Sequence, residues 1–223
     1  MPLKLVVFDL DGTLASTVDD LADAVNILRR RLGFRPLRTA AVARHVGQGA
    51  GRLLRNTIPR LSGSLLARHP DLLEEWRAIY RRRCLVRTRL YPGVPAALRR
   101  LRGVRMAVLS NKPGDISRRI LRGLGLGRRF RAVVGGDEMR RRKPHPAALL
   151  DLMRRFHAKP RETIVVGDSR FDMEAGRRAK AKLVAVTWGF GTRRELARWR
   201  PDAMVTRVSD LPQVLLRLGA HSR

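Results

Sequence analysis

The sequence has very little cysteine and few aromatic residues. Cys84 is the single cysteine among 223 residues, so the chain can form neither an intramolecular disulfide nor a thiolate zinc site, and it fits a reducing compartment. Aromatic residues make up 5% of the chain, which is too few to supply the stacking platforms on which single-stranded nucleic acids bind.

Long apolar runs are absent too. No run approaches the ~18 residues of a membrane span, and the one nearest the start, Leu5–Phe8, ends at Asp9. That run is too short for a signal peptide, and no cleavage-site pattern follows it. We therefore expect a cytoplasmic protein with no membrane partner.

Acidic residues and lysines are scarce as well. The chain has 48 Lys and Arg residues but only 19 Asp and Glu residues, which gives a net charge of +29 at pH 7. Six of the basic residues are lysines, at positions 4, 112, 143, 159, 180 and 182, and the other 42 are arginines. A nucleic-acid-binding surface would explain this charge, and so would arginine enrichment driven by nucleotide composition. Because the arginines are scattered along the whole chain, we favour the second explanation and expect no specific nucleic-acid partner, only nonspecific association with polyanions.

What the sequence does contain is an alternation of short apolar runs and helical stretches. A chain of this length can bury roughly 70% of its unfolded surface, so it needs no disulfide or metal to fold. The expected strands are 3–10, 105–110, 131–134, 163–166, 183–186 and 203–206. The expected helices are 95–101, 116–124, 146–156, 172–179, 193–199 and 211–218. Strands that are apolar on both faces and alternate with helices predict an α/β fold, with a Rossmann-like parallel sheet covered by helices on both faces.

Residues from about 15 to about 88 interrupt this alternation, and we expect no strand there. Apolar residues recur at helical spacing from Leu21 to Leu32, and Gly33 ends that helix. Further helices are expected at 39–46, 51–58 and 70–84. The turn at Tyr91-Pro92-Gly93 then returns the chain to the α/β body. The predicted domains are therefore a core of residues 1–15 and 88–223 and an inserted all-helical domain of residues 16–87.

The residues that could carry chemistry follow the predicted strands, and in open parallel sheets the active site lies at the carboxyl ends of the strands. Each group has an ordinary structural explanation when it is taken alone: a turn, a charged loop or a helix cap. It is much less ordinary for all four groups to occur in one chain, in order, at the ends of its predicted strands. The groups are Asp9-Leu10-Asp11-Gly12-Thr13, Ser110-Asn111, Lys143-Pro144, and Gly167-Asp168-Ser169 with Asp172.

This set resembles the haloacid dehalogenase superfamily at all four of its motifs. The resemblance implies that Asp9 attacks phosphorus to form an aspartyl-phosphate. It further implies that Asp11 protonates the leaving alkoxide and later deprotonates the attacking water, and that Thr13 orients Asp11. The inserted helices resemble the α-helical cap of the first type in that superfamily.

The resemblance also assigns the remaining motif residues. Lys143 would neutralise the charge of the nucleophile and the phosphoryl group, and Ser110 with the backbone N–H of Asn111 would hold phosphoryl oxygens. Gly12 would let the backbone approach the phosphate. Mg²⁺, which prefers oxygen ligands, is the implied cofactor. Its implied protein ligands are Asp9, Asp168, the carbonyl of Asp11, and Asp172 as a ligand or outer-shell acid.

Single residues narrow the reaction within the superfamily. The dehalogenases of this superfamily lack the second acid of the first motif, which is Asp11 in this chain. The pumping ATPases of the superfamily carry lysine at that position. Residues 15–87 contain no lysine, which argues against the Schiff-base chemistry of the phosphonatases. Hydrolysis of a phosphomonoester and sugar-phosphate mutation remain.

Segments 18–26 and 45–50 of the helical insert and segments 143–147, 165–170 and 188–193 of the core resemble those of the bacterial phosphoglycolate phosphatases. A small phosphorylated metabolite is the substrate that this resemblance implies. This chain has Ala15-Ser16-Thr17 where the bacterial phosphoglycolate phosphatases usually carry Val-Asp-Ser. Gln48 and Arg52 are the candidate specificity residues, because the loop Gly47–Gly49 offers backbone donors to an anion. The alternatives are a sugar-phosphate or amino-sugar-phosphate phosphatase, a pyrophosphatase or a β-phosphoglucomutase, in a monomer or a homodimer.

Overall fold

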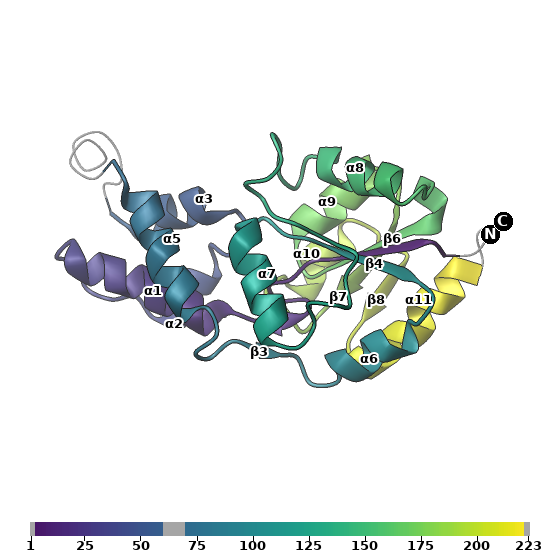
Figure 1. The fold of residues 1–223 in the computed structure, drawn as a ribbon, viewed down its shortest axis with the longest axis horizontal. Helices are drawn as coiled ribbons and strands as arrows, with labels where there is room; N and C mark the ends of the chain where they lie inside the picture. The colour runs from purple at the N-terminus through teal and green to yellow at the C-terminus, as the bar shows by residue number, and fades with distance from the viewer. Residues whose placement is uncertain (1–2, 60–69, 221–223) are drawn as a thin grey trace.

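The core of the protein is a six-stranded parallel sheet. In the computed structural model, which describes residues 3–59 and 70–220, the strand order is β5-β4-β1-β6-β7-β8 (Figure 1). The bounds are β1 Leu5–Phe8, β4 Arg105–Leu109, β5 Ala132–Val134, β6 Thr163–Gly167, β7 Lys182–Val186 and β8 Ala203–Val205. The strands form where the sequence has short Val- and Leu-rich runs, since such runs suit positions that are buried on both faces.

The register of the sheet brings three strand ends to the same level. Phe8, the last residue of β1, pairs with Val108 of β4 on one side and with Val166 of β6 on the other. The residues that follow these strands therefore emerge together at one edge of the sheet. This shared edge is the place where open α/β sheets bind their ligands.

Helices cover both faces of this sheet, as the alternating side chains of each strand require. Val6 and Phe8 of β1 pack on one face with α6, α7 and α11, whereas Leu5 and Val7 pack on the other with α8, α9 and α10. The bounds are α6 Val94–Arg100, α7 Gly114–Gly123, α8 Ala147–Arg155, α9 Arg170–Arg178, α10 Arg193–Ala197 and α11 Leu211–Ala220, with 3₁₀ turns at Pro160–Glu162 and Val208–Asp210. The predicted fold class is confirmed.

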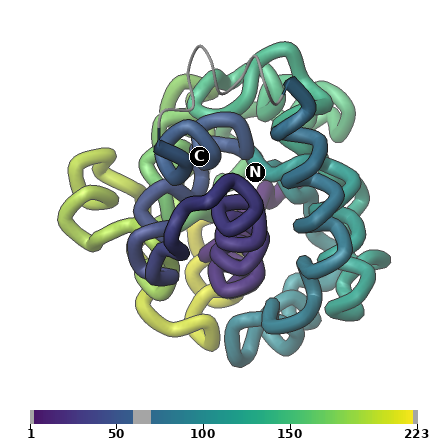
Figure 2. The backbone as a smooth tube through the Cα atoms, turned by 90° about the vertical axis from the view of Figure 1, so that its left-hand side faces the viewer, coloured from purple at the N-terminus to yellow at the C-terminus, as the bar shows by residue number. Residues whose placement is uncertain are grey.

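Among the described residues, four helices lie between the first strand and the rest of the core. We call residues 16–87 the helical segment; its described helices are α1 Val18–Arg31, α2 Thr39–Ala43, α3 Ala50–Thr57 and α5 Leu72–Arg83. They form a body at one end of the molecule (Figure 1), which Figure 2 views end-on. Their apolar faces pack together, and Trp76 and Tyr80 of α5 are among the largest fully buried side chains.

The connection between the helical segment and the core contains two short strands. Ala15–Ser16 forms β2, which pairs antiparallel with β3 at Arg89–Leu90. The buried carboxylate of Asp20 accepts hydrogen bonds from the backbone N–H groups of Arg87 and Thr88, which fastens the returning chain to α1. The expectation that no strand occurs between about 15 and about 88 is therefore wrong at β2, because a two-residue strand shows no periodicity.

Candidate active site

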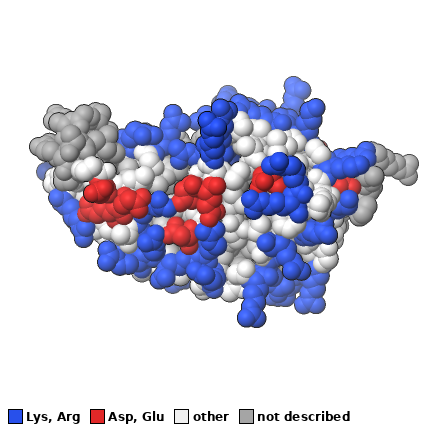
Figure 3. All heavy atoms as spheres, turned by 45° about the horizontal axis from the view of Figure 1, so that its top comes forward, with Lys and Arg blue, Asp and Glu red and all other residues white. Residues whose placement is uncertain are grey.

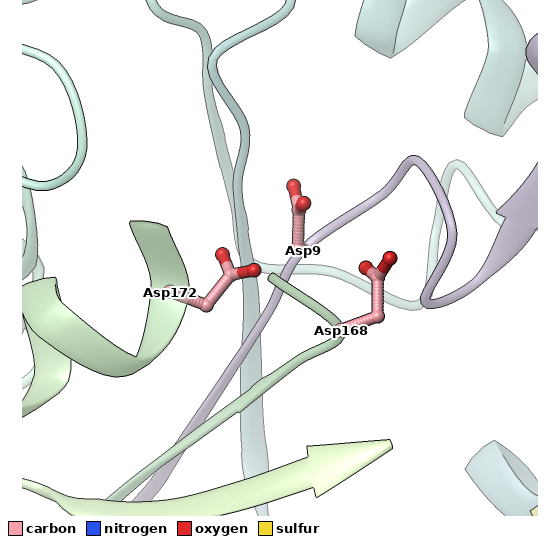
Figure 4. Close-up of side chains that lie close together, drawn as sticks. All are labelled: Asp9, Asp168 and Asp172. Atoms are coloured by element: carbon pink, nitrogen blue, oxygen red, sulfur yellow. The ribbon is translucent and has the colours of Figure 1, made fainter. Parts of the chain in front are cut away.

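Three buried carboxylates meet at the carboxyl edge of the sheet (Figure 4). Asp9 follows β1, Asp168 follows β6, and Asp172 lies in the first turn of α9. Each offers an oxygen, and these oxygens all lie within 4.8 Å of one another. Hard carboxylate oxygens at this spacing are suited to a divalent cation.

Lys143 lies beside this cluster and is almost entirely buried. Its Nζ is 3.0 Å from Asp9 Oδ1, and it donates to Asp172 Oδ1 and to the carbonyl of Leu109, each at 2.6 Å. Burial by itself would lower the pKa of Lys143, but the carboxylates of Asp172 and Asp9 outweigh burial and raise the pKa above its ordinary value. Lys143 therefore stays charged, as its predicted role requires.

One lysine does not balance three carboxylates. Burial raises the pKa of Asp9 to about 7, although Lys143 opposes this change, and Asp172 and Asp11 add to it. Burial, together with Asp172 and Asp9, also raises the pKa of Asp168 well above its ordinary value. The site without a metal ion thus favours bound protons, and a divalent cation would supply the missing positive charge.

This charge excess predicts that the metal-free protein loses stability as the pH rises. The pKa of Asp9 is about 7 in the folded protein and 3.8 for an ordinary aspartate. The contribution of Asp9 to the free energy of unfolding is therefore fully present below about pH 4 and is lost as the pH rises past 7. Between pH 5 and pH 8 the loss is on the order of 3 kcal/mol, because Asp9 is already ionised in the unfolded protein at pH 5. Urea unfolding in EDTA at these two pH values would measure it.

Mg²⁺ should stabilise the protein more at pH 8 than at pH 5, since the cation binds the ionised carboxylates. Asp9→Asn is the matched control, because it removes one of the two carboxyl groups whose pKa is raised, and it should reduce the slope. A free energy of unfolding in EDTA that rises from pH 5 to pH 8, or the same slope in Asp9→Asn, would contradict this account.

Asp168 is held in place by two donors. The hydroxyl of Thr13 donates to Asp168 Oδ1 at 2.8 Å, and the backbone N–H of Phe190 donates to Oδ2 at 2.7 Å. The prediction that Thr13 orients Asp11 is therefore wrong in this structure. Gly12 has a φ of +81°, and a Cβ there would lie 2.2 Å from Asp168 Oδ2. Gly12 thus leaves room for this carboxylate, a reason that its sequence motif did not reveal.

The side chain of Asp11 lies apart from the cluster of three acids. Its Oδ1 accepts a hydrogen bond of 2.5 Å from the hydroxyl of Thr17 and lies 3.1 Å from Nζ of Lys112. The implied metal ligand at this position is the backbone carbonyl, and that role stays a prediction.

Ser110 and Asn111 follow β4 and are buried beside the acids. The Nδ2 group of Asn111 donates to the carbonyl of Gly47 at 2.8 Å and to the carbonyl of Lys143 at 2.9 Å. Asn111 thereby links the helical segment to the loop that carries the lysine. Ser110 Oγ accepts from the backbone N–H of Lys112 at 3.3 Å, so its own proton remains for another acceptor.

A pocket opens above these residues, between the helical segment and the core. The core side includes Asp9, Asp11, Ser110, Asn111 and Lys112, and the side of the helical segment includes His45, Gly47, Leu53 and Trp76. The structure therefore brings three of the predicted catalytic residues, Asp9, Asp11 and Ser110, to the floor of one pocket. Thr13 and Lys143 are not part of its lining, and Lys143 lines the adjoining pocket.

Gln48 and Arg52 lie elsewhere. They line an adjoining pocket, together with Arg55, Arg142 and Lys143. Sequence reasoning also missed Lys112 and Trp76, which line the pocket above Asp9. Lys112 follows Ser110-Asn111 directly, so its position was a signal that could have been used. Trp76 gave none, because an aromatic residue at helical spacing is ordinarily part of a core.

Comparison with known proteins agrees with this geometry. Residues 6–186 match the family model described as haloacid dehalogenase-like hydrolase. A phosphoglycolate phosphatase of Pseudomonas syringae is 39% identical over 219 residues, covering 95% of this chain and 78% of that protein. One of Nitrosospira multiformis is 35% identical over 212 residues, covering 92% of each chain.

Solved structures show the same likeness. The crystal structure of a predicted phosphoglycolate phosphatase from Haemophilus somnus has a TM-score of 0.84 at 27% identity, covering 95% of this chain and 97% of that one. The chain belongs to the haloacid dehalogenase-like hydrolase family. Within that family it is a phosphatase, as the sequence predicted.

The surface and the helices add two further observations. On the face that Figure 3 shows, basic side chains spread over both the helical segment and the core and do not gather in one patch. Among residues 3–59 and 70–220, no helix is both long and apolar enough to cross a membrane.

Proposed function

We propose that this protein is a Mg²⁺-dependent phosphatase that hydrolyses 2-phosphoglycolate to glycolate and phosphate through an aspartyl-phosphate. One observation carries the reaction type. Asp9, Asp168, Asp172 and Lys143 form one buried cluster, and Asp9 of this cluster lines the pocket between the helical segment and the core. Phosphoryl transfer requires this combination of a positioned nucleophile and positive charge against the phosphoryl oxygens.

The reaction then follows in two steps. A carboxylate oxygen of Asp9 bonds to phosphorus, the ester P–O bond breaks, and Asp11 gives its proton to the leaving oxygen. Water next attacks the aspartyl-phosphate, Asp11 takes a proton from it, and the P–O bond to Asp9 breaks to release phosphate. Throughout, Lys143 and the Ser110 hydroxyl offset the negative charge of the phosphoryl group.

The metal ion would be held by Asp9, Asp168 and Asp172, with the backbone carbonyl of Asp11 as a further ligand. These oxygen donors fit Mg²⁺, which would supply positive charge at the phosphoryl oxygens. Thr13 and the N–H of Phe190 fix the orientation of Asp168, and Ser169 donates to Asp172 through both its hydroxyl and its backbone N–H. Such hydrogen bonds orient ligands and stabilise their ionised forms.

We further propose that residues 16–87 act as a cap over a core of residues 1–15 and 88–223. The pairing of β2 with β3 marks the two connections about which the cap would open. A cap that closes over the pocket would exclude bulk water during the transfer and then release the product.

The identity of the substrate is supported by the relatives named phosphoglycolate phosphatase. It is tested by phosphate release from 2-phosphoglycolate, glucose 1-phosphate, an amino-sugar phosphate and pyrophosphate, each with Mg²⁺ and with EDTA. We expect metal-dependent release with the highest kcat/KM on 2-phosphoglycolate. A higher kcat/KM on another ester would overturn the proposed substrate. Conversion of glucose 1-phosphate to glucose 6-phosphate would indicate a mutase. No release from any of them would overturn the enzyme class.

Gln48 and Arg52 remain our proposed specificity residues, acting from the adjoining pocket that also contacts Lys143. Arg52→Ala should raise KM for 2-phosphoglycolate about 5- to 10-fold, the loss of one charge-assisted contact, and leave kcat for acetyl phosphate unchanged. Arg128→Ala, on the core surface, is the control. An equal loss on both substrates would contradict a specificity role for Arg52.

A further inference from the structure

The ammonium group of Lys112 is buried between the general acid and the cap. Its Nζ lies 3.1 Å from Asp11 Oδ1, donates to the hydroxyl of Tyr80 and sits 4.3 Å from the centre of the Tyr80 ring. Lys112 is 5% exposed, so these interactions are shielded from water. Neither Lys112 nor Tyr80 has a role in the proposed reaction.

The contacts of Asp11 are uneven between its two oxygens. Among the described residues, the hydrogen bond from Thr17 and the ion pair with Lys112 both fall on Oδ1. An oxygen that already accepts from two donors is poorly placed to carry or receive another proton. Oδ2 is thus the oxygen left to exchange a proton with the leaving group, and the two donors fix its direction.

Lys112 is itself held from both sides. On the core side, its backbone N–H donates to Ser110 Oγ at 3.3 Å and its carbonyl accepts from the N–H of Gly136 at 2.9 Å. On the cap side, Tyr80 of α5 stacks on Trp76 with ring centroids 5.2 Å apart, which restrains the phenol. The chain of contacts from Asp11 through Lys112 to Tyr80 therefore crosses from the core to the cap.

We propose that Lys112 and Tyr80 are positioning residues that aim Asp11 at the leaving oxygen when the cap lies over the core. This inference rests on the proposed function, in which the ester P–O bond breaks as the proton of Asp11 passes to the departing alkoxide. Lys112 donates no proton in that step; it holds Oδ1 so that Oδ2 faces the substrate. Tyr80 in turn holds the ammonium, and only a closed cap brings it there.

The choice of leaving group tests this inference. Ethyl phosphate and acetyl phosphate are similar in size, but ethoxide needs a proton to depart and acetate does not. A residue that aims the general acid should matter for the first substrate far more than for the second. A residue that merely stabilises the fold should affect both alike, so we use the ratio of their kcat/KM values as the readout.

We expect Asp11→Asn to lower kcat/KM for ethyl phosphate by roughly 10²- to 10⁴-fold, the range of general acid catalysis, with a much smaller loss on acetyl phosphate. Lys112→Met should cause a smaller loss of the same kind, lowering kcat/KM for ethyl phosphate about 10- to 100-fold relative to acetyl phosphate. Tyr80→Phe, which keeps the ring, should give a loss of about 3- to 10-fold in the same direction. The double variant should match Lys112→Met, since Tyr80 acts through the lysine.

The matched control is Lys4→Met, which removes a lysine paired with Glu162 at the far end of β1. It should leave the ratio unchanged. A selective loss in Asp11→Asn with an unchanged ratio in Lys112→Met and Tyr80→Phe would overturn the inference alone. An unchanged ratio in Asp11→Asn would overturn the general acid of the proposed function and this inference with it. Tyr80→Phe keeps the test decisive if Lys112→Met does not fold.

Discussion

Asp9→Asn is expected to reduce metal-dependent phosphate release by at least about 10⁴-fold, the scale on which loss of a nucleophile abolishes covalent catalysis. An amide oxygen is a poor nucleophile towards phosphorus, and it brings no negative charge to a divalent cation. Asp9 lies at the point where β1 ends, and one of its oxygens lies within 4.8 Å of oxygens of Asp168 and Asp172 (Figure 4). The measurement is release of inorganic phosphate from 2-phosphoglycolate at saturating Mg²⁺.

Two further measurements make this prediction specific to a covalent mechanism. Acid quenching during turnover, followed by mass spectrometry, should find a phosphoryl group on the peptide that contains Asp9 in the unaltered protein and none in Asp9→Asn. Asp151→Asn is the control, because this acid pairs with arginines on the outer face of α8. Release at near the original rate from Asp9→Asn would mean that water attacks phosphorus directly.

The sheet could be predicted from the sequence because its strands are short apolar runs that are buried on both faces. The order of the strands then decided which residues meet. Phe8 pairs with both Val108 and Val166, so the residues after β1, β4 and β6 had to reach the same edge. The assignment of Asp9 and Asp168 to one site follows from this topology alone.

The partners of single side chains could not be predicted in the same way. Thr13 was expected at Asp11, but its hydroxyl bonds to Asp168, since a turn allows several directions that sequence spacing does not distinguish. Lys112 and Tyr80 are 32 positions apart and belong to different parts of the fold. Their contact depends on how the cap lies over the core, which no local pattern encodes.

The specificity residues show the same limit. The glycine-rich loop predicts Gln48 and Arg52 as specificity residues, yet they line the pocket beside the one above Asp9. His45 and Trp76 line the central pocket instead. The sequence identified the correct loop, whereas the direction of each side chain depends on the backbone of that loop, where Gly47 and Gly49 have φ values of +90° and +83°.

Lys143→Met is expected to have the second-largest effect, and it should act on stability and on activity through the same contacts. Removing the ammonium leaves Asp9 and Asp172 buried beside each other without the cation that lies within 3.0 Å of both. A buried charge that loses its partner costs about 3–5 kcal/mol. In EDTA this loss should be larger at pH 8 than at pH 5, because the pKa of Asp9 is already about 7 with the lysine present and protonation relieves the repulsion at low pH.

Activity should fall about 10²- to 10³-fold in Lys143→Met, the usual loss when one donor to the developing charge is removed. Saturating Mg²⁺ should restore much of the stability, since the cation neutralises the same carboxylates, but little of the activity, since it cannot also take the place of the lysine at the phosphoryl group. Lys159→Met, at an exposed position, is the control for the loss of one positive charge. Equal unfolding free energies for Lys143→Met and Lys159→Met in EDTA at pH 8 would mean that Asp9 and Asp172 are not both ionised there. The charge balance that supports the metal site would then be wrong as well.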